Sequence, residues 1–124
     1  MLKVKRIAAA AGMGTLLLTE AMAGRKITDE VVITSTYFSG SMGSARASAD
    51  SLQYIGCFTV NGDGGSCYAR DAAGTTKMCA WSNPNFLRTV ESINPASSIY
   101  VEFTKSTCTY IDVGNFSWYR PMTP

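Results

Sequence analysis

The chain has 124 residues, a formal net charge of +2 and no histidine. The missing histidine removes the commonest general base at neutral pH, and with it every Ser-His or Cys-His nucleophile pair. Neither a Ser-x-x-Lys nor a Gly-x-Ser-x-Gly motif occurs in residues 24–124. The sequence therefore offers no histidine-dependent nucleophile and no serine-nucleophile motif, and it favours a non-enzymatic protein.

Residues 1–23 have the pattern of a signal peptide. Lys3, Lys5 and Arg6 precede an uncharged, mostly apolar run at 7–18, and Ala21-Met22-Ala23 supplies a small-x-small cleavage site. Such a short run cannot cross a hydrocarbon core of about 30 Å as a helix. The sequence predicts Sec-type export with cleavage after Ala23. We therefore expect a secreted or periplasmic bacterial protein that has no membrane anchor after cleavage. Residues 24–124 are expected to form a single domain.

Removal of the leader changes the charge balance. The leader carries three of the eleven basic residues and one of the nine acidic residues, so eight of each remain and the net charge of 24–124 is zero. Proteins that bind nucleic acid or anionic membranes electrostatically keep a basic excess. We therefore expect neither as a partner.

All four cysteines lie in the predicted domain, at Cys57, Cys67, Cys79 and Cys108. An even number in a small exported chain predicts two disulfides. Zinc sites usually need cysteine pairs separated by about two to four residues, whereas nine, eleven and twenty-eight residues separate these four. We therefore expect no metal and no cofactor.

The first half of the predicted domain is rich in strand-forming residues. A β-branched and aromatic run at 31–38 predicts a strand, and the small residues at 39–51 predict a connector, either a loop or a weak helical turn. Strands at 54–60, 66–70 and 75–81 then form a meander, with turns at 61–65 and 71–74. Alternation of side chains in these strands brings Cys57, Cys67 and Cys79 to one side.

The second half predicts one helix and one hairpin. Ser82 or Asn83 caps a helix at 83–93 that carries one apolar stripe, and strands at 98–104 and 108–113 follow, while 114–124 is expected to be irregular. We therefore expect an α+β fold in which about five mostly antiparallel strands carry one helix. An all-β sandwich with one helical insertion is the alternative.

Three disulfide connectivities are open to four cysteines. We favour Cys67 with Cys79, which closes a local hairpin, and Cys57 with Cys108, which ties the meander to the C-terminal hairpin.

The chain contains thirteen aromatic residues, more than so small a core is expected to bury. Exposed aromatic rings stack on sugars or anchor protein interfaces. Trp81, Tyr110, Trp118 and Tyr119 are the candidates for this role, although capping of the edges of a small core is the favoured interpretation of these residues. The predicted function is a binding module, or an inhibitor as a variant of one, for a protein or glycan in the envelope or extracellular space.

The rival function is a small hydrolase that uses carboxylates. Its candidate residues are Asp63, Asp71, Glu102 and Asp112, but Asp63 and Asp71 lie in predicted turns, where aspartate is common for structural reasons.

Three further stretches carry a resemblance. Tyr54-Ile55-Gly56-Cys57, the segment CYARDAAG at 67–74 and Cys79 resemble a group of small exported bacterial proteins with no established function. The resemblance implies export and a shared disulfide-bearing fold, and it supplies no activity, site or partner.

Overall fold

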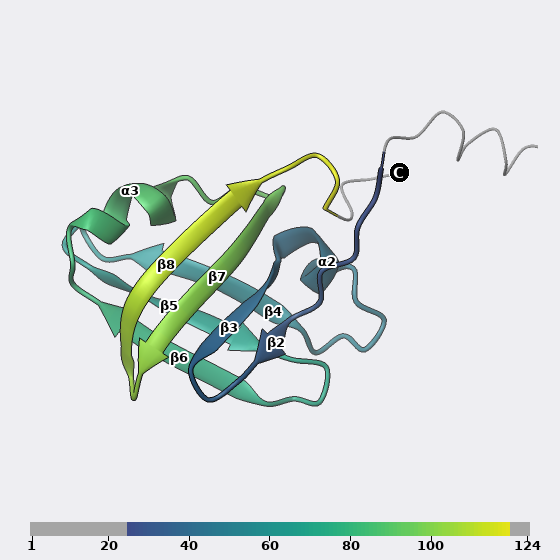
Figure 1. Ribbon diagram of the computed structural model, residues 1–124, viewed down its shortest axis with the longest axis horizontal. Helices are drawn as coiled ribbons and strands as arrows, with labels where there is room; N and C mark the ends of the chain where they lie inside the picture. The colour runs from purple at the N-terminus through teal and green to yellow at the C-terminus, as the bar shows by residue number, and fades with distance from the viewer. Residues whose placement is uncertain (1–24, 120–124) are drawn as a thin grey trace, which may run out of the picture.

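The computed structural model describes residues 25–119, so the predicted signal peptide and its cleavage site lie outside the described residues. Seven strands form one mixed sheet in the order β2-β3-β7-β8-β6-β5-β4 (Figure 1). The elements are β2 (Val32–Ile33), β3 (Tyr37–Ser41), α2 (Met42–Arg46), β4 (Tyr54–Thr59), β5 (Gly65–Arg70), β6 (Thr76–Trp81), α3 (Asn85–Glu91), β7 (Ser97–Thr104) and β8 (Thr107–Asn115).

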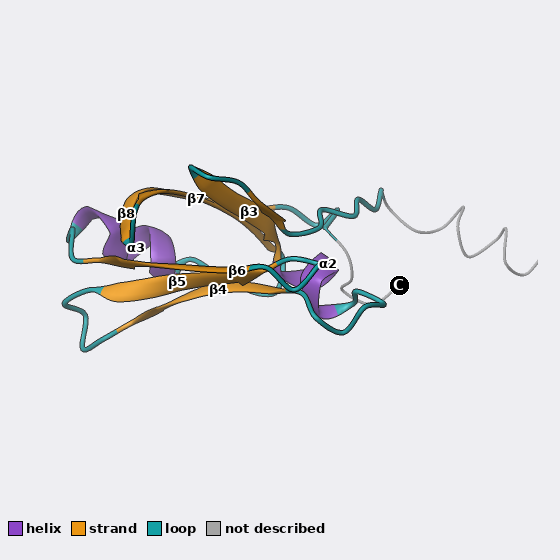
Figure 2. Cartoon of the chain, turned by 90° about the horizontal axis from the view of Figure 1, so that it is seen from below, coloured by secondary structure: helices purple, strands orange, loops and turns teal. Residues whose placement is uncertain are grey.

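The sheet folds back on itself into two layers (Figure 2). β3, β7 and β8 lie in one layer and β4, β5 and β6 lie in the other, while α2 and α3 lie at opposite ends of the molecule. The layers meet at β6 and β8, which are parallel and share the single register pair Ala80 with Thr107. At this seam the amide of Ala80 also donates to the carbonyl of Ser106, at 2.8 Å.

The predicted meander is present as β4, β5 and β6, which pair antiparallel. Its first turn holds Asn61 and Gly62 at positive φ, the conformation that these two residue types tolerate best. In the second turn the Asp71 carboxylate accepts hydrogen bonds from the amides of Ala73 and Thr75, at 3.1 and 2.9 Å. The structural role expected for an aspartate in this turn is therefore observed.

The strand predicted at 31–38 is wrong in its extent, because the chain reverses inside it. The Thr34 hydroxyl accepts hydrogen bonds from the amides of Thr36 and Tyr37 and donates to the Tyr37 carbonyl. These local bonds hold a turn that separates β2 from β3, and the two strands pair antiparallel. The β-branched residues of this stretch indicated an extended chain. They did not indicate the turn, which depends on hydrogen bonds of the Thr34 hydroxyl.

The connector predicted after this strand begins later than expected. β3 continues to Ser41, whose hydroxyl accepts from the amide of Ser44 at 3.1 Å and caps α2. α2 packs against β3, β4 and β7 through its small residues Gly43, Ser44 and Ala45, all buried. The helical-turn form of the connector is thus the one present.

The predicted helix and the C-terminal hairpin are both present, but α3 is shorter than expected and its N-cap is Pro84, not Ser82 or Asn83. α3 contacts β4 and β8, with Val90 buried and Phe86, Leu87 and Ile93 packed against the core. β7 and β8 pair antiparallel around a turn in which Lys105 has φ of 54°. β8 extends to Asn115, so the first part of the tail predicted as irregular is strand.

The expected five strands and one helix are too few, since the described chain has seven strands and two short helices. The chain is mostly β, and its two layers fit the sandwich alternative in part. Side chains from both layers fill the space between them, and the largest fully buried ones include Phe38, Ile99 and Val101. Buried Cys67 and Cys79 extend this core across β5 and β6.

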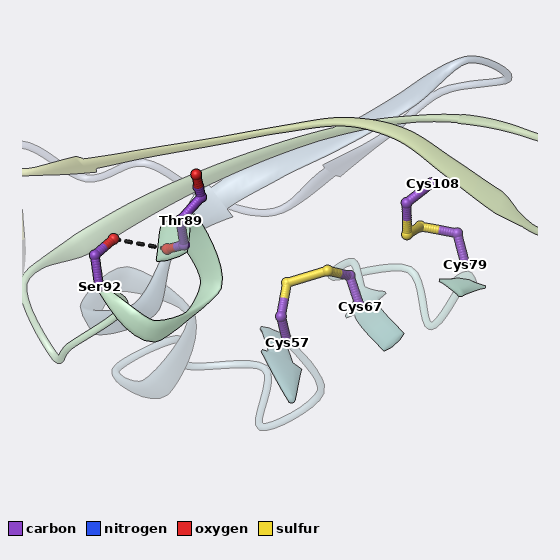
Figure 3. The surroundings of a disulfide bond; sticks show 6 residues. All are labelled: Cys57, Cys67, Cys79, Thr89, Ser92 and Cys108. Atoms are coloured by element: carbon purple, nitrogen blue, oxygen red, sulfur yellow. Dashed lines mark hydrogen bonds between the residues drawn. A yellow bond between two sulfur atoms is a disulfide. The ribbon is translucent and has the colours of Figure 1, made fainter. Parts of the chain in front are cut away.

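The structure corrects the expected disulfide pairing. Cys57 is joined to Cys67 and Cys79 to Cys108, with Cα–Cα distances of 4.0 and 5.1 Å (Figure 3). Cys57, Cys67 and Cys79 form one row across β4, β5 and β6, as alternation predicted.

The strand order explains the pairing. β8 lies beside β6, whereas β4 is the far edge of the same layer. The strand order places Cys108 next to Cys79, whereas Cys57 lies two strand spacings, about 10 Å, from Cys79, which is more than the Cα–Cα span of a disulfide. The two disulfides are compatible with a periplasmic or extracellular location.

Peptide mapping checks the connectivity. Trypsin cleaves after Arg46, Arg70, Lys77, Arg88 and Lys105, which places Cys57 and Cys67 in one peptide and the other two cysteines in separate peptides. Without reductant we expect peptide 47–70 to carry an internal disulfide and peptide 78–88 to be linked to the one that begins at Ser106. A species that joins all three peptides would contradict the observed pairing.

The two disulfides should differ in their effect on stability. Chain-entropy estimates give about 3 to 4 kcal/mol for Cys79–Cys108, with a sequence separation of 29, and about 2 to 3 kcal/mol for Cys57–Cys67, with a separation of 10. Urea unfolding of the double variants Cys79→Ala/Cys108→Ala and Cys57→Ala/Cys67→Ala measures both losses. A larger loss for the second variant would contradict the dominance of the bond that crosses the layers.

Candidate binding surface

The outer side of the layer formed by β4, β5 and β6 is unusually apolar. Because alternate residues face opposite sides of a strand, the row of cysteines points inward and its neighbours point outward. Gly56, Tyr68 and Met78 form one outward row across the three strands, with Phe58 beside it on β4. The rings of Phe58 and Tyr68 stack, with centroids 5.9 Å apart and 19° between their planes.

We call this side the apolar face and define it as Tyr54, Gly56, Phe58, Val60, Tyr68 and Met78. Five of the eight large apolar residues exposed in the described chain belong to it, with exposed fractions from 39% for Tyr68 to 52% for Val60. Single exposed apolar residues are ordinary, but a contiguous patch on a soluble domain marks an interaction site. The apolar face is therefore the main candidate for a binding surface.

Few charges accompany the apolar face. The strands β4, β5 and β6 contain Arg70 and Lys77 and no acidic residue. Lys77 is on the inward row, where its Nζ lies 4.4 Å from the centroid of the Phe103 ring of the other layer. The outer side thus has one guanidinium, that of Arg70, at its end near the 71–74 turn.

The outer side of the other layer has a different character. Tyr37, Tyr100 and Tyr110 lie together there, with ring centroids 5.2 Å apart for the first pair and 6.2 Å for the second. The Tyr100 hydroxyl donates to Glu102 at 2.7 Å, and this hydrogen bond raises the pKa of Tyr100 to about 12. Asp112 pairs with Tyr100 in the register. The side combines aromatic rings with two carboxylates, and β2, β3, β7 and β8 contain no lysine or arginine.

The aromatic residues singled out from the sequence fall in three places. Trp81 is only 5% exposed and lies in the core against Phe86, so its proposed binding role is wrong. Its side chain follows Cys79 on the inward row of β6, which turns it toward the other layer. Tyr110, in contrast, is 48% exposed. It lies on the outer side of β3, β7 and β8, which we call the tyrosine side.

Trp118 and Tyr119 form a separate cluster near the end of the described chain. Trp118 stacks on Phe116 with centroids 4.8 Å apart, and the Arg25 guanidinium lies 4.9 Å from the Trp118 ring centroid. The amide of Ile27 donates to the Trp118 carbonyl, so the cluster joins the two ends of the described chain. Both rings are half-buried, and they pack against each other and against Phe116.

Sequence reasoning missed the members of the apolar face on β5 and β6. The sequence pattern indicates strands at Tyr54 and Phe58, and it assigned no binding role to these residues or to Tyr68 and Met78. The available signal was their position relative to the cysteines. Each of Gly56, Phe58, Tyr68 and Met78 is adjacent in sequence to a cysteine that points inward, so alternation alone turns all four outward.

The four carboxylates proposed for catalysis do not converge. Asp63 and Asp71 lie in different turns, and Glu102 and Asp112 lie on the other layer as diagonal neighbours on adjacent strands. A different acidic pair shares a depression of about 480 Å³ beside α2. There the Gln53 side-chain amide donates to Glu30 at 3.3 Å and to Asp50 at 2.8 Å.

This acidic pair organises the chain around it. The side-chain oxygen of Gln53 accepts a hydrogen bond from the buried backbone amide of Val31. The Asp50 carboxylate accepts hydrogen bonds from the backbone amides of Leu52 and Gln53. The hydrogen bond from the Gln53 side chain, followed by that from Leu52, lowers the pKa of Asp50 to about 2. Asp50 is therefore ionised at neutral pH and suited to hold this loop.

No group of three or more histidine, cysteine, aspartate or glutamate residues in 25–119 is arranged to hold a metal ion. Within the same range, no helix is long and apolar enough to cross a membrane.

The Asp50 network predicts a defined pH dependence. Because the folded-state pKa of Asp50 is below its usual value near 3.8, its contribution to stability is present above that value and is lost as pH falls toward 2. Asp50→Asn should therefore be less stable than the native chain at pH 6, with the gap closing between pH 4 and pH 2. Urea unfolding across this range measures the gap. Asp63→Asn, in the exposed turn after β4, is the matched control, and a gap at Asp50 that stays constant with pH would contradict the assignment.

Comparison of the chain with protein-family models, with curated proteins and with solved structures gives no match. The proposed function therefore rests on the geometry of residues 25–119 and on the sequence pattern of residues 1–23.

Proposed function

We propose that this protein is an exported interaction module that binds another protein through the apolar face. One observation carries the proposal, namely the gathering of five large exposed apolar side chains on the outer side of a single layer. Aromatic residues and methionine are enriched at the centres of protein interfaces, where they provide large contact area at low entropic cost. The disulfides and compact core supply a rigid support for these side chains.

Export is the second part of the proposal. The signal-peptide pattern of residues 1–23 supports it, and two disulfides in a chain of this size are typical of proteins that act outside the reducing cytosol. The bound partner is then expected in the envelope or the extracellular space. If that partner is an enzyme, the protein would act as its inhibitor.

A protein is favoured over a glycan as the ligand because few polar groups surround the aromatic rings of the apolar face. Sugar sites combine aromatic platforms with polar side chains that bond the sugar hydroxyls. The apolar face lacks carboxylates and amide side chains, and Phe58, Val60 and Met78 carry no hydrogen-bonding group. Its chemistry suits an apolar protein surface with a neutral or acidic rim near Arg70.

The hydrolase alternative draws its best support from the depression shared by Glu30 and Asp50. A general acid at neutral pH needs a raised pKa, whereas that of Asp50 is lowered to about 2. Gln53 also occupies both carboxylates. These features favour a structural role for the pair, and therefore the interaction module.

Two substitutions test the binding face. Immobilised 24–124 captures partners from the envelope fraction and culture medium, and Tyr68→Ala and Met78→Ala should each weaken a captured complex by about 1 to 2 kcal/mol or more if they are anchors. Since both side chains are exposed, the unfolding free energy should change little. Raising salt from about 50 to about 200 mM should change affinity far less than the 10³-fold or greater loss expected for a phosphate binder.

Tyr110→Ala provides the matched control, since this tyrosine is about equally exposed but lies on the opposite layer. It should leave binding unchanged. A complex that tolerates both apolar-face variants but is lost with Tyr110→Ala would place the binding surface on the tyrosine side instead.

A further inference from the structure

The tyrosine side is a regular array of aromatic rings and carboxylates. Its rings belong to Tyr37 on β3, Tyr100 on β7 and Tyr110 on β8, and its carboxylates belong to Glu102 on β7 and Asp112 on β8. In the register, Glu102 lies between Tyr37 on one strand and Tyr110 on the other, and Tyr100 lies opposite Asp112. Residues opposite each other on adjacent strands have Cβ atoms about 5 Å apart. Every ring of the array therefore has a carboxylate as a direct neighbour on an adjacent strand.

The array is held in place by its own contacts and is open to solvent. Tyr100 is the central ring, packed against Tyr37 and Tyr110, and its hydroxyl orients the Glu102 carboxylate through a hydrogen bond of 2.7 Å. α2 contacts β3 and β7, and α3 contacts β8, but both helices lie at the ends of the molecule (Figure 2). Tyr110 and Asp112 are exposed and the other three side chains are half-buried, so a ligand can reach the whole array.

No basic side chain of these strands balances the carboxylates. Pairs of opposite charge on adjacent strands stabilise a sheet, yet β2, β3, β7 and β8 contain no lysine or arginine. Lys105 lies in the turn that joins β7 to β8, outside both strands. A third carboxylate adds to the negative charge, because Asp29 accepts a hydrogen bond of 2.9 Å from the hydroxyl of Ser98, which shares the outer side of β7 with the array. The tyrosine side is therefore complementary in charge to a cationic ligand.

We propose that the tyrosine side binds an arginine-bearing segment of a second protein, with guanidinium groups stacked on the rings and paired with Glu102 and Asp112. Cations are attracted to the face of a tyrosine ring within about 6 Å of its centroid. A guanidinium is planar, so it stacks on a ring and also donates paired hydrogen bonds to a carboxylate, whereas a lysine ammonium acts as a point charge. The array offers both kinds of partner at the spacing of adjacent strands, about 5 Å.

This surface is independent of the apolar face and does not rest on the proposed function. The two surfaces lie on the outer sides of different layers and share no residue, so both can be occupied at the same time. Binding at the tyrosine side should weaken as salt is added, because exposed charges are screened over about 8 Å at physiological ionic strength. Contact through the apolar face should resist salt. The two surfaces are therefore separable by experiment.

Fluorescence anisotropy with a labelled peptide of alternating arginine and glycine tests the proposal. In the matched control peptide, citrulline replaces arginine, which keeps the shape of the side chain and removes its charge. At low ionic strength, about 20 mM salt, purified 24–124 should bind the arginine peptide with a submillimolar Kd and should not bind the citrulline peptide. A lysine peptide of the same length should bind more weakly than the arginine peptide.

Variants of the array assign the binding to this surface. Glu102→Gln, Asp112→Asn and Tyr110→Ala should each weaken binding of the arginine peptide by about 3-fold or more, whereas Tyr110→Phe keeps the ring and should retain binding. Asp63→Asn removes an equal charge from the turn after β4, and Tyr68→Ala alters the apolar face, so neither should have an effect. Glu102→Gln keeps a hydrogen-bond acceptor and the other side chains are exposed, so unfolding free energies should stay near the native value.

Several outcomes would contradict the proposal. Equal binding of the arginine and citrulline peptides would overturn it, as would the absence of binding at a protein concentration of about 1 mM. An equal loss in Asp63→Asn and Asp112→Asn would overturn it too, because binding would then follow net charge and not the array. A lysine peptide that binds as tightly as the arginine peptide would overturn the choice of a guanidinium. Peptide binding that is lost with Tyr68→Ala would place the peptide on the apolar face instead.

Discussion

The fold depends on the seam where β6 meets β8. Each layer is held internally by antiparallel ladders, but between β6 and β8 the sheet is continuous through only one register pair, Ala80 with Thr107. The Cys79–Cys108 disulfide joins the residues immediately next to that pair and crosses between the layers at the same point. Both cysteines are buried, so the bond also fills the core that the layers share. A covalent cross-link thus lies where the sheet is continuous through a single register pair, and it joins the two layers there.

The folded sheet divides the side chains into those inside and those on two outer sides. Because the core lies between the layers, alternate side chains of each strand point into it, and the other side chains lie on the outer side of their layer. The outer side of β4, β5 and β6 is apolar with a single nearby guanidinium, while the outer side of β3, β7 and β8 combines tyrosines with Glu102 and Asp112. This difference is not needed for folding, because neither side contributes to the core. It is the feature of the molecule that most directly indicates recognition.

The two edges of the sheet are also unlike each other. β2 has only two residues, whereas β4 has six, contributes to the apolar face and contacts both helices. Gly56 lies between Tyr54 and Phe58 on β4, and its missing side chain leaves open space on the apolar face.

Local chemistry in the sequence determined much of this protein. Period-two alternation identified β7, the turn residues identified the meander, and apolar spacing identified α3, since each signal acts over a few neighbouring residues. Alternation also predicted that Cys57, Cys67 and Cys79 lie in one row. The same alternation implies that Tyr68 and Met78, which are next to these cysteines in the sequence, face outward. Other features required the tertiary structure, because they depend on which strands become neighbours. Cys67 lies opposite two cysteines, and only the position of β8 beside β6 decides that Cys79 bonds to Cys108. Trp81 looked like a surface ring in the sequence, yet the second layer closes over it, because burial is set by segments distant in the chain.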